Sequence, residues 1–186
     1  RLQIVDNVLE EVGLKKAANT LIGVPGFTKG ISGGERKRLS IAMELLTGPS
    51  VLFLDEPTTG LDARTALNVI QTIDKLARSG RTIVLTIHQP RSDIVSLFDK
   101  VLLLARGKVA YYGKAKEVTQ YFGKMGYHCP RGYNLADFMI DMVADAPMGS
   151  PLQETTDKRI THILDTYEKQ KDLIETPPEL DPSKNY

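Results

Sequence analysis

Two adjacent carboxylates follow a short apolar run. Asp55 and Glu56 come directly after Val51–Leu54. In open α/β sheets, ligands collect outside the carboxyl ends of the strands. A carboxylate there can hold Mg²⁺ beside a nucleotide phosphate, and its neighbour can take a proton from an attacking water. Taken alone, the pair is equally consistent with two solvated acidic residues at the end of a strand that have no role in catalysis.

A glycine pair forms a second candidate for phosphate binding. Ser32, Gly33 and Gly34 stand where a helix is expected to begin. Main-chain N–H groups and the helix dipole favour an anion at such a position, and the Ser32 hydroxyl adds a donor. A structural interpretation exists beside this one, because Ser32 and Glu35 have the spacing of a capping box. The two interpretations are compatible.

Two further polar residues border predicted elements. His88 directly follows the apolar run Thr82–Ile87, where an imidazole could contact a γ-phosphate or orient a water. Asp62 precedes a helical pattern at 63–78 and suits its N-cap. A lone histidine is more often structural or solvated, so neither residue decides the function by itself.

Helices and strands alternate around these residues. Helical spacing predicts helices near residues 4–12, 33–46, 63–78, 94–98, 114–124, 134–143 and 157–174. Apolar runs predict strands at 51–54, 82–87, 101–104 and 109–112. The first two are continuous enough to be buried on both faces, whereas the last two form an antiparallel hairpin. This order indicates an α/β fold with a mostly parallel sheet, followed by a linker or tail at 176–183.

Composition limits the class of protein. The 186 residues include 24 Lys and Arg against 23 Asp and Glu, a net charge of +1. This balance argues against a binder that relies on bulk electrostatics, so no nucleic-acid partner is expected. One cysteine excludes a disulfide framework and a Cys-rich metal site. The purely apolar runs are too short to cross a bilayer.

The order and spacing of the four candidate segments resemble the ATP-binding cassette (ABC) ATPases. Ile31–Glu35 is similar to the signature motif of that family. Val51–Pro57 resembles the Walker B strand with the catalytic glutamate, Thr59–Asp62 the D-loop, and His88 the switch histidine. The departures are isoleucine for leucine at position 31 and glutamate for glutamine at position 35.

Several stretches narrow the resemblance to subfamily G, the white/brown-complex and pleiotropic-drug-resistance exporters. They are Ser32–Arg38, Asp55–Asp62, Ile87–Arg91, Phe98–Lys100, Tyr127–Pro130 and Tyr133–Phe138. In the last, Leu135 replaces a proline of the subfamily element. The resemblance covers residues 1–145, a partial nucleotide-binding domain. Residues 146–186 are expected to be a connector toward a membrane domain outside this chain.

The resemblance implies a P-loop NTPase-like fold, with ATP and Mg²⁺ as cofactors. Asp55 would help to hold Mg²⁺, Glu56 would activate water, and His88 would contact the γ-phosphate. Ser32, Gly33, Gly34 and Glu35 would serve the ATP bound to a second cassette, a homo- or heterodimer partner, and Asp62 would couple the two sites. The expected parent is an exporter of a lipid-like or hydrophobic small molecule, with this cassette at the cytosolic face of a membrane.

One family element is absent from the sequence. A P-loop has the pattern Gly-x-x-x-x-Gly-Lys-Ser/Thr, and no Gly-Lys-Ser or Gly-Lys-Thr occurs here. In the family this element would precede Arg1, so the chain is expected to be N-terminally truncated and inactive alone. Two alternatives stay open. One is a non-catalytic truncated module that binds a partner cassette, and the other is an ABC ATPase without a role in transport.

Overall fold

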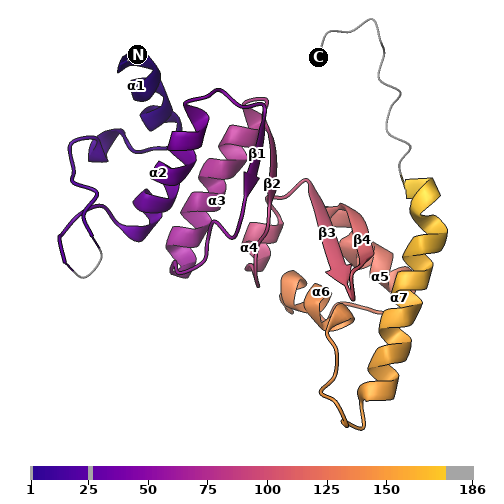
Figure 1. Cartoon of the computed structure of the whole chain (residues 1–186). Helices are drawn as coiled ribbons and strands as arrows, with labels where there is room; N and C mark the ends of the chain where they lie inside the picture. The colour runs from indigo at the N-terminus through magenta and orange to yellow at the C-terminus, as the bar shows by residue number, and fades with distance from the viewer. Residues whose placement is uncertain (1, 25–26, 175–186) are drawn as a thin grey trace, which may run out of the picture. The chain divides into compact units, whose positions relative to one another are not determined.

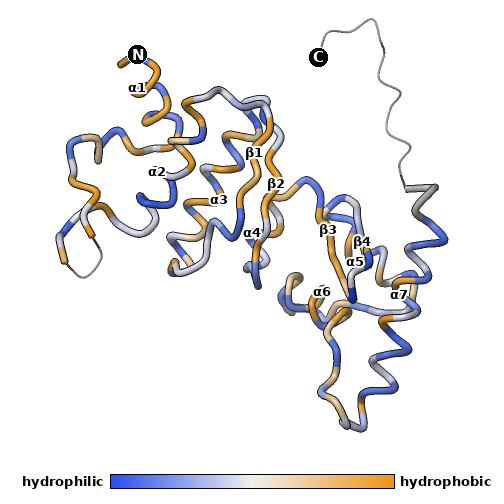
Figure 2. The backbone as a smooth tube through the Cα atoms, in the orientation of Figure 1, coloured by the Kyte–Doolittle hydropathy of each residue, from blue (hydrophilic) through white to orange (hydrophobic). Residues whose placement is uncertain are grey.

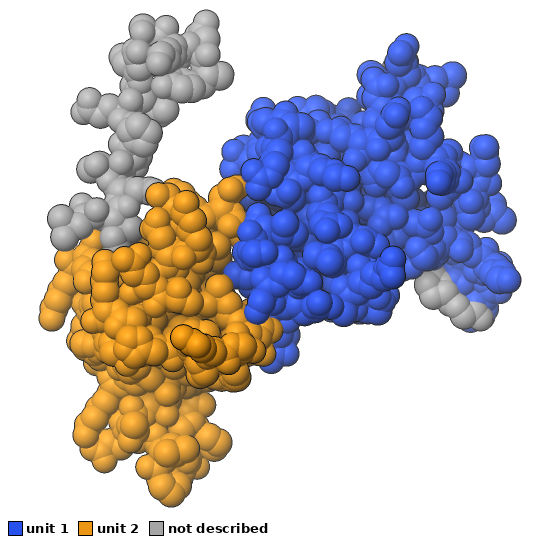
Figure 3. Space-filling view, turned by 180° about the vertical axis from the view of Figure 1, so that it is seen from behind, with its two compact units in different colours: residues 1–97 blue, residues 98–186 orange. Residues whose placement is uncertain are grey.

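The computed structural model describes residues 2–24 and 27–174. The chain divides into two compact units, Arg1–Leu97 and Phe98–Tyr186 (Figure 3). The first unit contains α1 (Leu2–Glu11), η1 (Lys15–Ala17), α2 (Gly33–Leu45), β1 (Val51–Leu54), α3 (Ala63–Arg78), β2 (Thr82–Leu85) and α4 (Ser92–Val95). The second contains β3 (Lys100–Ala105), β4 (Lys108–Lys114), η2 (Ala115–Glu117), α5 (Val118–Lys124), α6 (Leu135–Val143) and α7 (Gln153–Ile174).

A parallel pair of strands organises the first unit. β1 pairs with β2, and Leu54 lies opposite Leu85 at their carboxyl ends. The connection between them runs through α3, which packs against β2 and α2 (Figure 1). The helix spans 63–78, as predicted, because Asp62 caps its first N–H groups and Ser79 with Gly80 ends it. Its buried stripe includes Val69, Ile70, Ile73 and Leu76.

The parallel pair is covered on one face only. Leu52 is 5% exposed, whereas Phe53 is 77% and Val84 50% exposed. Side chains alternate between the two faces of a sheet, so a one-sided cover hides every second residue. The predicted burial on both faces is therefore wrong for the described residues. Figure 2 shows that both strands are nevertheless apolar along their length.

An antiparallel hairpin organises the second unit. β3 pairs with β4 as predicted, with a register irregularity between Leu103 and Leu104. The turn places Arg106 and Gly107 at φ of 50° and 74°, the left-handed region that two-residue hairpin turns require. α6 and α7 pack against each other and against strands of this hairpin. Phe122 of α5 lies edge-on to Phe138 of α6, with ring centroids 5.8 Å apart.

Several predicted helices differ in extent. The helix expected at 94–98 is α4, Ser92–Val95. The helix expected at 114–124 is a 3-10 turn, η2, followed by α5. The last helix, α7, begins at Gln153 instead of residue 157. The linker predicted at 176–183 lies outside the described residues. Within the ranges that are described, no helix is long and apolar enough to span a membrane.

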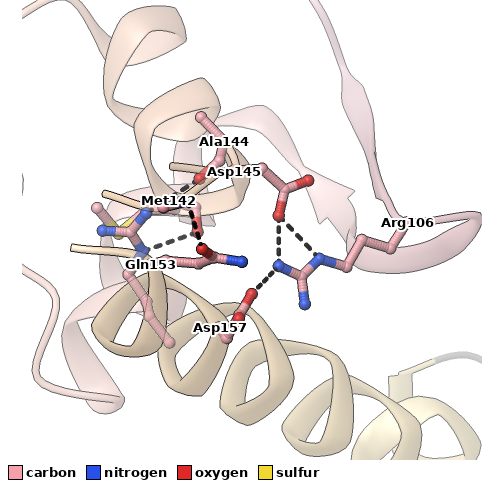
Figure 4. A network of polar contacts seen from close by, with 8 residues as sticks. Arg106, Met142, Ala144, Asp145, Gln153 and Asp157 are labelled. Carbon is pink, nitrogen blue, oxygen red and sulfur yellow. Dashed lines mark hydrogen bonds and ion pairs between the residues drawn. The ribbon is translucent and has the colours of Figure 1, made fainter. Parts of the chain in front are cut away.

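A polar network fixes the start of α7 (Figure 4). Arg106, at the hairpin turn, pairs with Asp145 and Asp157, and its Nε lies 3.0 Å from Asp145 Oδ1. Arg159 donates from Nε to the Met142 carbonyl oxygen at 3.2 Å. Helix α7 is thereby tied to the hairpin turn and to the end of α6. The functional boundary expected at residue 145 falls inside this network and stays a prediction.

Candidate functional site

At the carboxyl ends of β1 and β2, the two candidate acids, Asp55 and Glu56, both contact Thr86. Leu54 lies opposite Leu85, so the next residues along each strand also meet, and the Thr86 N–H donates to the Leu54 carbonyl oxygen at 3.0 Å. The Thr86 hydroxyl donates to Asp55 Oδ1 at 2.6 Å and accepts from the Glu56 N–H at 2.9 Å. A hydroxyl can do both at once. The parallel pairing therefore holds both acidic residues through β2.

Glu56 adopts a strained backbone conformation. Its φ of 42° lies in the left-handed region, which costs a non-glycine residue about 1–3 kcal/mol. The Thr59 hydroxyl donates to Glu56 Oε2 at 2.7 Å, and Lys37 Nζ donates to its carbonyl oxygen at 3.4 Å. The side chain is exposed. Glu56 is thus fixed at its main chain and at one carboxylate oxygen while still open to solvent, as a base acting on water must be.

The start of α2 is a capping box. Ser32 N–H and Ser32 Oγ each lie 2.8 Å from Glu35 Oε2, and the Glu35 N–H donates back to Ser32 Oγ at 3.3 Å. The pKa of Glu35 is lowered, first by the hydrogen bond from the Ser32 N–H and then by that from its hydroxyl. The structural interpretation of these residues is confirmed, and the Ser32 hydroxyl is already engaged within the chain.

The two glycines allow α2 to approach α3. A Cβ on the buried Gly34 would lie 2.4 Å from Thr65 Cγ2, far inside van der Waals contact. A Cβ on Gly33 would lie 3.3 Å from Leu61 Cδ2. Packing alone therefore requires glycine at position 34. The same contacts place the Ser32–Glu35 segment beside the segment that ends at Asp62.

Asp62 is the N-cap of α3. Its Oδ1 accepts from the N–H groups of Arg64 and Thr65, both at 3.1 Å. Hydrogen bonds from the Thr65 side chain and main chain, followed by the Arg64 N–H, lower the pKa of this exposed carboxyl. The structural role predicted for Asp62 is confirmed, and the carboxylate is held ionised at the surface.

His88 stands apart from the other candidates. β2 ends at Leu85, so His88 lies three residues beyond the strand instead of directly after it as predicted. Its side chain is exposed, and the neighbouring Gln89 has a φ of 45°. Across 2–24 and 27–174 the structure gives His88 no hydrogen bond to Asp55 or Glu56. It lies on the segment that leaves the same end of the sheet.

The oxygen atoms at the carboxyl end of β1 suit a metal ion that is also coordinated by a bound ligand. The described residues contain no group of three His, Cys, Asp or Glu side chains that could hold a metal ion alone. Asp55 has one oxygen bonded to Thr86 and is otherwise exposed. Mg²⁺ is commonly bound by one or two carboxylates together with waters and phosphate oxygens. Asp55 fits that manner of binding.

Comparison with known proteins gives this arrangement a context. A family model described as ABC transporter matches residues 2–59, and one described as ABC-2 type transporter matches residues 88–168. The chain is 53% identical over 144 residues to ABC transporter G family member 1 of Dictyostelium discoideum, covering 77% of this chain and 18% of that protein. It is 48% identical over 167 residues to Protein white of Drosophila melanogaster, covering 90% of this chain and 24% of that protein.

The chain belongs to the ABC transporter family. These relatives agree with the subfamily G resemblance, and the chain spans about a fifth of their length. A solved structure, cbiO1 from Clostridium perfringens, part of the ABC transporter complex cbiONQ, is 30% identical with a TM-score of 0.52 and covers 67% of this chain and 46% of that one. The P-loop NTPase-like fold class is thereby confirmed.

The two matched ranges contain most of the candidate residues. Residues 2–59 include the capping box, Asp55 and Glu56, and the second matched range begins at His88. Inspection of the sequence missed Thr86 and Thr59, which hold the two acids. Thr59 is three residues from Glu56 and could have been proposed from a turn. Thr86 could be found only from the register of β1 and β2.

Proposed function

We propose that this chain is the ATP-hydrolysing cassette region of an ABC exporter that moves a lipid-like or hydrophobic small molecule across a membrane. The observation that carries the proposal is the arrangement of Asp55, Glu56 and Thr86 at the carboxyl ends of two parallel strands. Both side chains are exposed there, and each carboxylate accepts a hydrogen bond from a neutral hydroxyl. The names of the relatives, which include transporters of the G family, support the transport part.

Each acid has a distinct role in this proposal. Asp55 offers its exposed carboxylate oxygen to Mg²⁺ beside the phosphates of ATP. Glu56, fixed by Thr59 and by its own main chain, orients and deprotonates the attacking water. His88 contacts the γ-phosphate from the loop that follows β2. When bound, Mg²⁺ supplies the neutralisation of charge that phosphoryl transfer requires.

The start of α2 serves a second cassette. Gly33 and Gly34 present main-chain N–H groups at a helix N-terminus, which favours a phosphate bound to the partner cassette. Ser32 and Glu35 shape this terminus through their capping box. Asp62 lies beside this segment and couples the two sites across the interface. We propose that the parent protein carries a covalently attached membrane domain and that this cassette lies at the cytosolic face.

Glu56→Gln in the full-length protein, reconstituted into lipid vesicles, tests the assignment. Gln keeps the shape of the side chain and removes the base, so we expect ATP hydrolysis to fall about 100-fold or more while ATP binding stays near wild-type. Glu154→Gln, an exposed glutamate on α7, is the matched control and should hydrolyse ATP normally. Transport preserved in the Glu56→Gln variant would overturn the assignment.

The 186-residue chain by itself is expected to lack turnover. Its sequence contains no Gly-Lys-Ser or Gly-Lys-Thr, the pair that ends a P-loop and contacts phosphate and Mg²⁺. Purified chain incubated with Mg²⁺ and ATP should therefore release no phosphate above background. Sustained release that Glu56→Gln abolishes would contradict this expectation.

A further inference from the structure

One hydroxyl at the end of β2 contacts both acids of the candidate site. The Thr86 hydroxyl donates to Asp55 and accepts from the Glu56 N–H, at 2.6 and 2.9 Å. These bonds span 31 and 30 residues of sequence, so they depend on the pairing of the two strands. A hydroxyl that donates one hydrogen bond and accepts another in this way is held in one orientation. It therefore restricts the positions of the Asp55 carboxylate and the Glu56 main chain.

Thr82 shows that this arrangement is specific to position 86. Thr82 begins β2 and Thr86 directly follows the strand, and their even spacing places both on the same exposed face. The main-chain N–H of Thr82 bonds to the Ser50 carbonyl oxygen, which serves the strand ladder. Thr86 has the equivalent main-chain bond and adds the two hydroxyl bonds to the acids. Strand propensity explains a threonine at either position, and it leaves the hydroxyl bonds of Thr86 unexplained.

We propose that Thr86 is a positioning residue for the ATP site. Its hydroxyl fixes the carboxylate of Asp55 so that the other oxygen faces outward toward Mg²⁺. The same oxygen accepts the Glu56 N–H and so supports the left-handed backbone at Glu56. A hydrogen bond from a hydroxyl to a carboxylate is short and charge-assisted, and it leaves the negative charge in place. This inference rests on the proposed function and names a residue that acts through Asp55 and Glu56.

Thr86→Val and Thr86→Ser separate the hydroxyl from the shape of the side chain. Valine keeps the β-branched shape that a strand favours but can neither donate to Asp55 nor accept from Glu56. Serine keeps the hydroxyl. Thr82→Val makes the same chemical change on the same face of β2, away from the acids, and is the matched control.

Amide hydrogen exchange in the 186-residue chain tests the geometry without any nucleotide. Thr86→Val should speed the exchange of the Glu56 N–H several-fold, because its acceptor is gone. Thr86→Ser and Thr82→Val should leave it at the wild-type rate, and the amides of α3 report that every variant is folded. Unchanged exchange at Glu56 in folded Thr86→Val would overturn the proposal.

The Mg²⁺ dependence of ATP hydrolysis and of nucleotide binding in the full-length protein tests the proposed role of Thr86. Removing a group that orients a metal ligand commonly costs 10–100-fold in metal affinity. We therefore expect Thr86→Val to raise, by about 10-fold or more, the Mg²⁺ concentration that half-saturates both ATP hydrolysis and the binding of a fluorescent ATP analogue. Thr86→Ser should restore the wild-type value, and Thr82→Val should retain it.

The outcomes distinguish the two proposals. Wild-type protein that hydrolyses ATP, combined with an unchanged half-saturating Mg²⁺ concentration in Thr86→Val, overturns the role of Thr86 and leaves the proposed function standing. Wild-type protein without Mg²⁺-dependent hydrolysis overturns the proposed function, and the role of Thr86 falls with it. A raised concentration in Thr86→Val that Thr86→Ser restores supports both.

Discussion

In the first unit, the carboxylates of Asp55 and Glu56 receive hydrogen bonds from the hydroxyls of Thr86 and Thr59. In the second unit, the carboxylates of Asp145 and Asp157 share the guanidinium group of Arg106. Both arrangements bring segments far apart in sequence to one place. The first uses neutral donors, and the second uses a cation.

The type of donor decides what each acidic pair can do. A hydroxyl orients a carboxylate and leaves its charge, so a bound cation or a proton in transfer can still use it. A guanidinium group orients the carboxylates and also compensates their charge, which suits a structural tie. Hydrogen bonds to Asp145 and then to Asp157 raise the pKa of Arg106, so this tie stays charged. The contrast supports the catalytic role that we propose for the first pair, and the second pair anchors α7.

Replacing one acidic residue in each unit should give the largest difference in the rate of ATP hydrolysis. Asp55→Asn removes a proposed ligand of Mg²⁺. Because a bound metal ion stabilises the transition state by several kcal/mol, ATP hydrolysis by the full-length protein should fall about 100-fold. Asp145→Asn should hydrolyse ATP at close to the wild-type rate. Equal losses in the two variants would remove the distinction between the units.

Gly34→Ala should affect stability more than any change to the carboxylates. The added Cβ would lie 2.4 Å from Thr65 Cγ2, and overpacking of this kind costs about 1–3 kcal/mol in the free energy of unfolding. Urea denaturation of the 186-residue chain measures it. Thr65→Ser removes the clashing methyl group, so the double variant should recover part of the loss. A fully stable single variant would mean that packing does not require this glycine.

Arg106→Gln should loosen the second unit. The change removes both ion pairs and leaves Asp145 and Asp157 facing each other, so the thermal midpoint should fall by a few degrees at low salt. Salt screens like charges, so the deficit should shrink at high salt. Lys158→Gln, which breaks an exposed pair with Glu154 one turn away on α7, should change the midpoint far less. A comparable drop in both variants would argue against a special role for Arg106.

Glu35→Gln should give the smallest effect, which is a change in how the free energy of unfolding depends on pH. The folded pKa of Glu35 is below the ordinary value of 4.5, so its carboxylate contributes stability above pH 4.5 that is lost as pH falls through the lowered pKa. Glu35→Gln cannot titrate. The stability difference between wild-type and this variant should thus be constant at neutral pH and disappear in acid. Glu44→Gln on the same helix is the control, and a difference that persists in acid would contradict the capping role.

Local features of this chain were predictable because a few neighbouring residues decide them. The bounds of α3 follow from its apolar stripe, the cap at Asp62 and the stop at Ser79 and Gly80. The capping box joins residues three apart. The candidate acids were found because each follows an apolar run. Their proposed roles depend on the family resemblance and stay predictions.

One prediction failed for a reason that lies outside the strands themselves. β1 and β2 have the continuous apolar sequence of strands buried on both faces, yet Phe53 and Val84 are exposed. Strand sequence states which side chains can be buried. Which faces are covered depends on what packs against them, and in the first unit every second residue along these strands stays uncovered.

The sequence alone determined the order of the elements, the caps of α2 and α3, and the segments that could carry chemistry, since hydrophobic period and short-range hydrogen bonding specify these. Only the tertiary structure decided which distant side chains meet. The pairing of Thr86 with Asp55 depends on strand register, and the contact of Gly34 with Thr65 on the distance between two helices. The Arg106 pairs span 39 and 51 residues and require the hairpin to fold onto α7. Such contacts form because packing fixes backbone positions over the whole unit, and no local pattern contains that information.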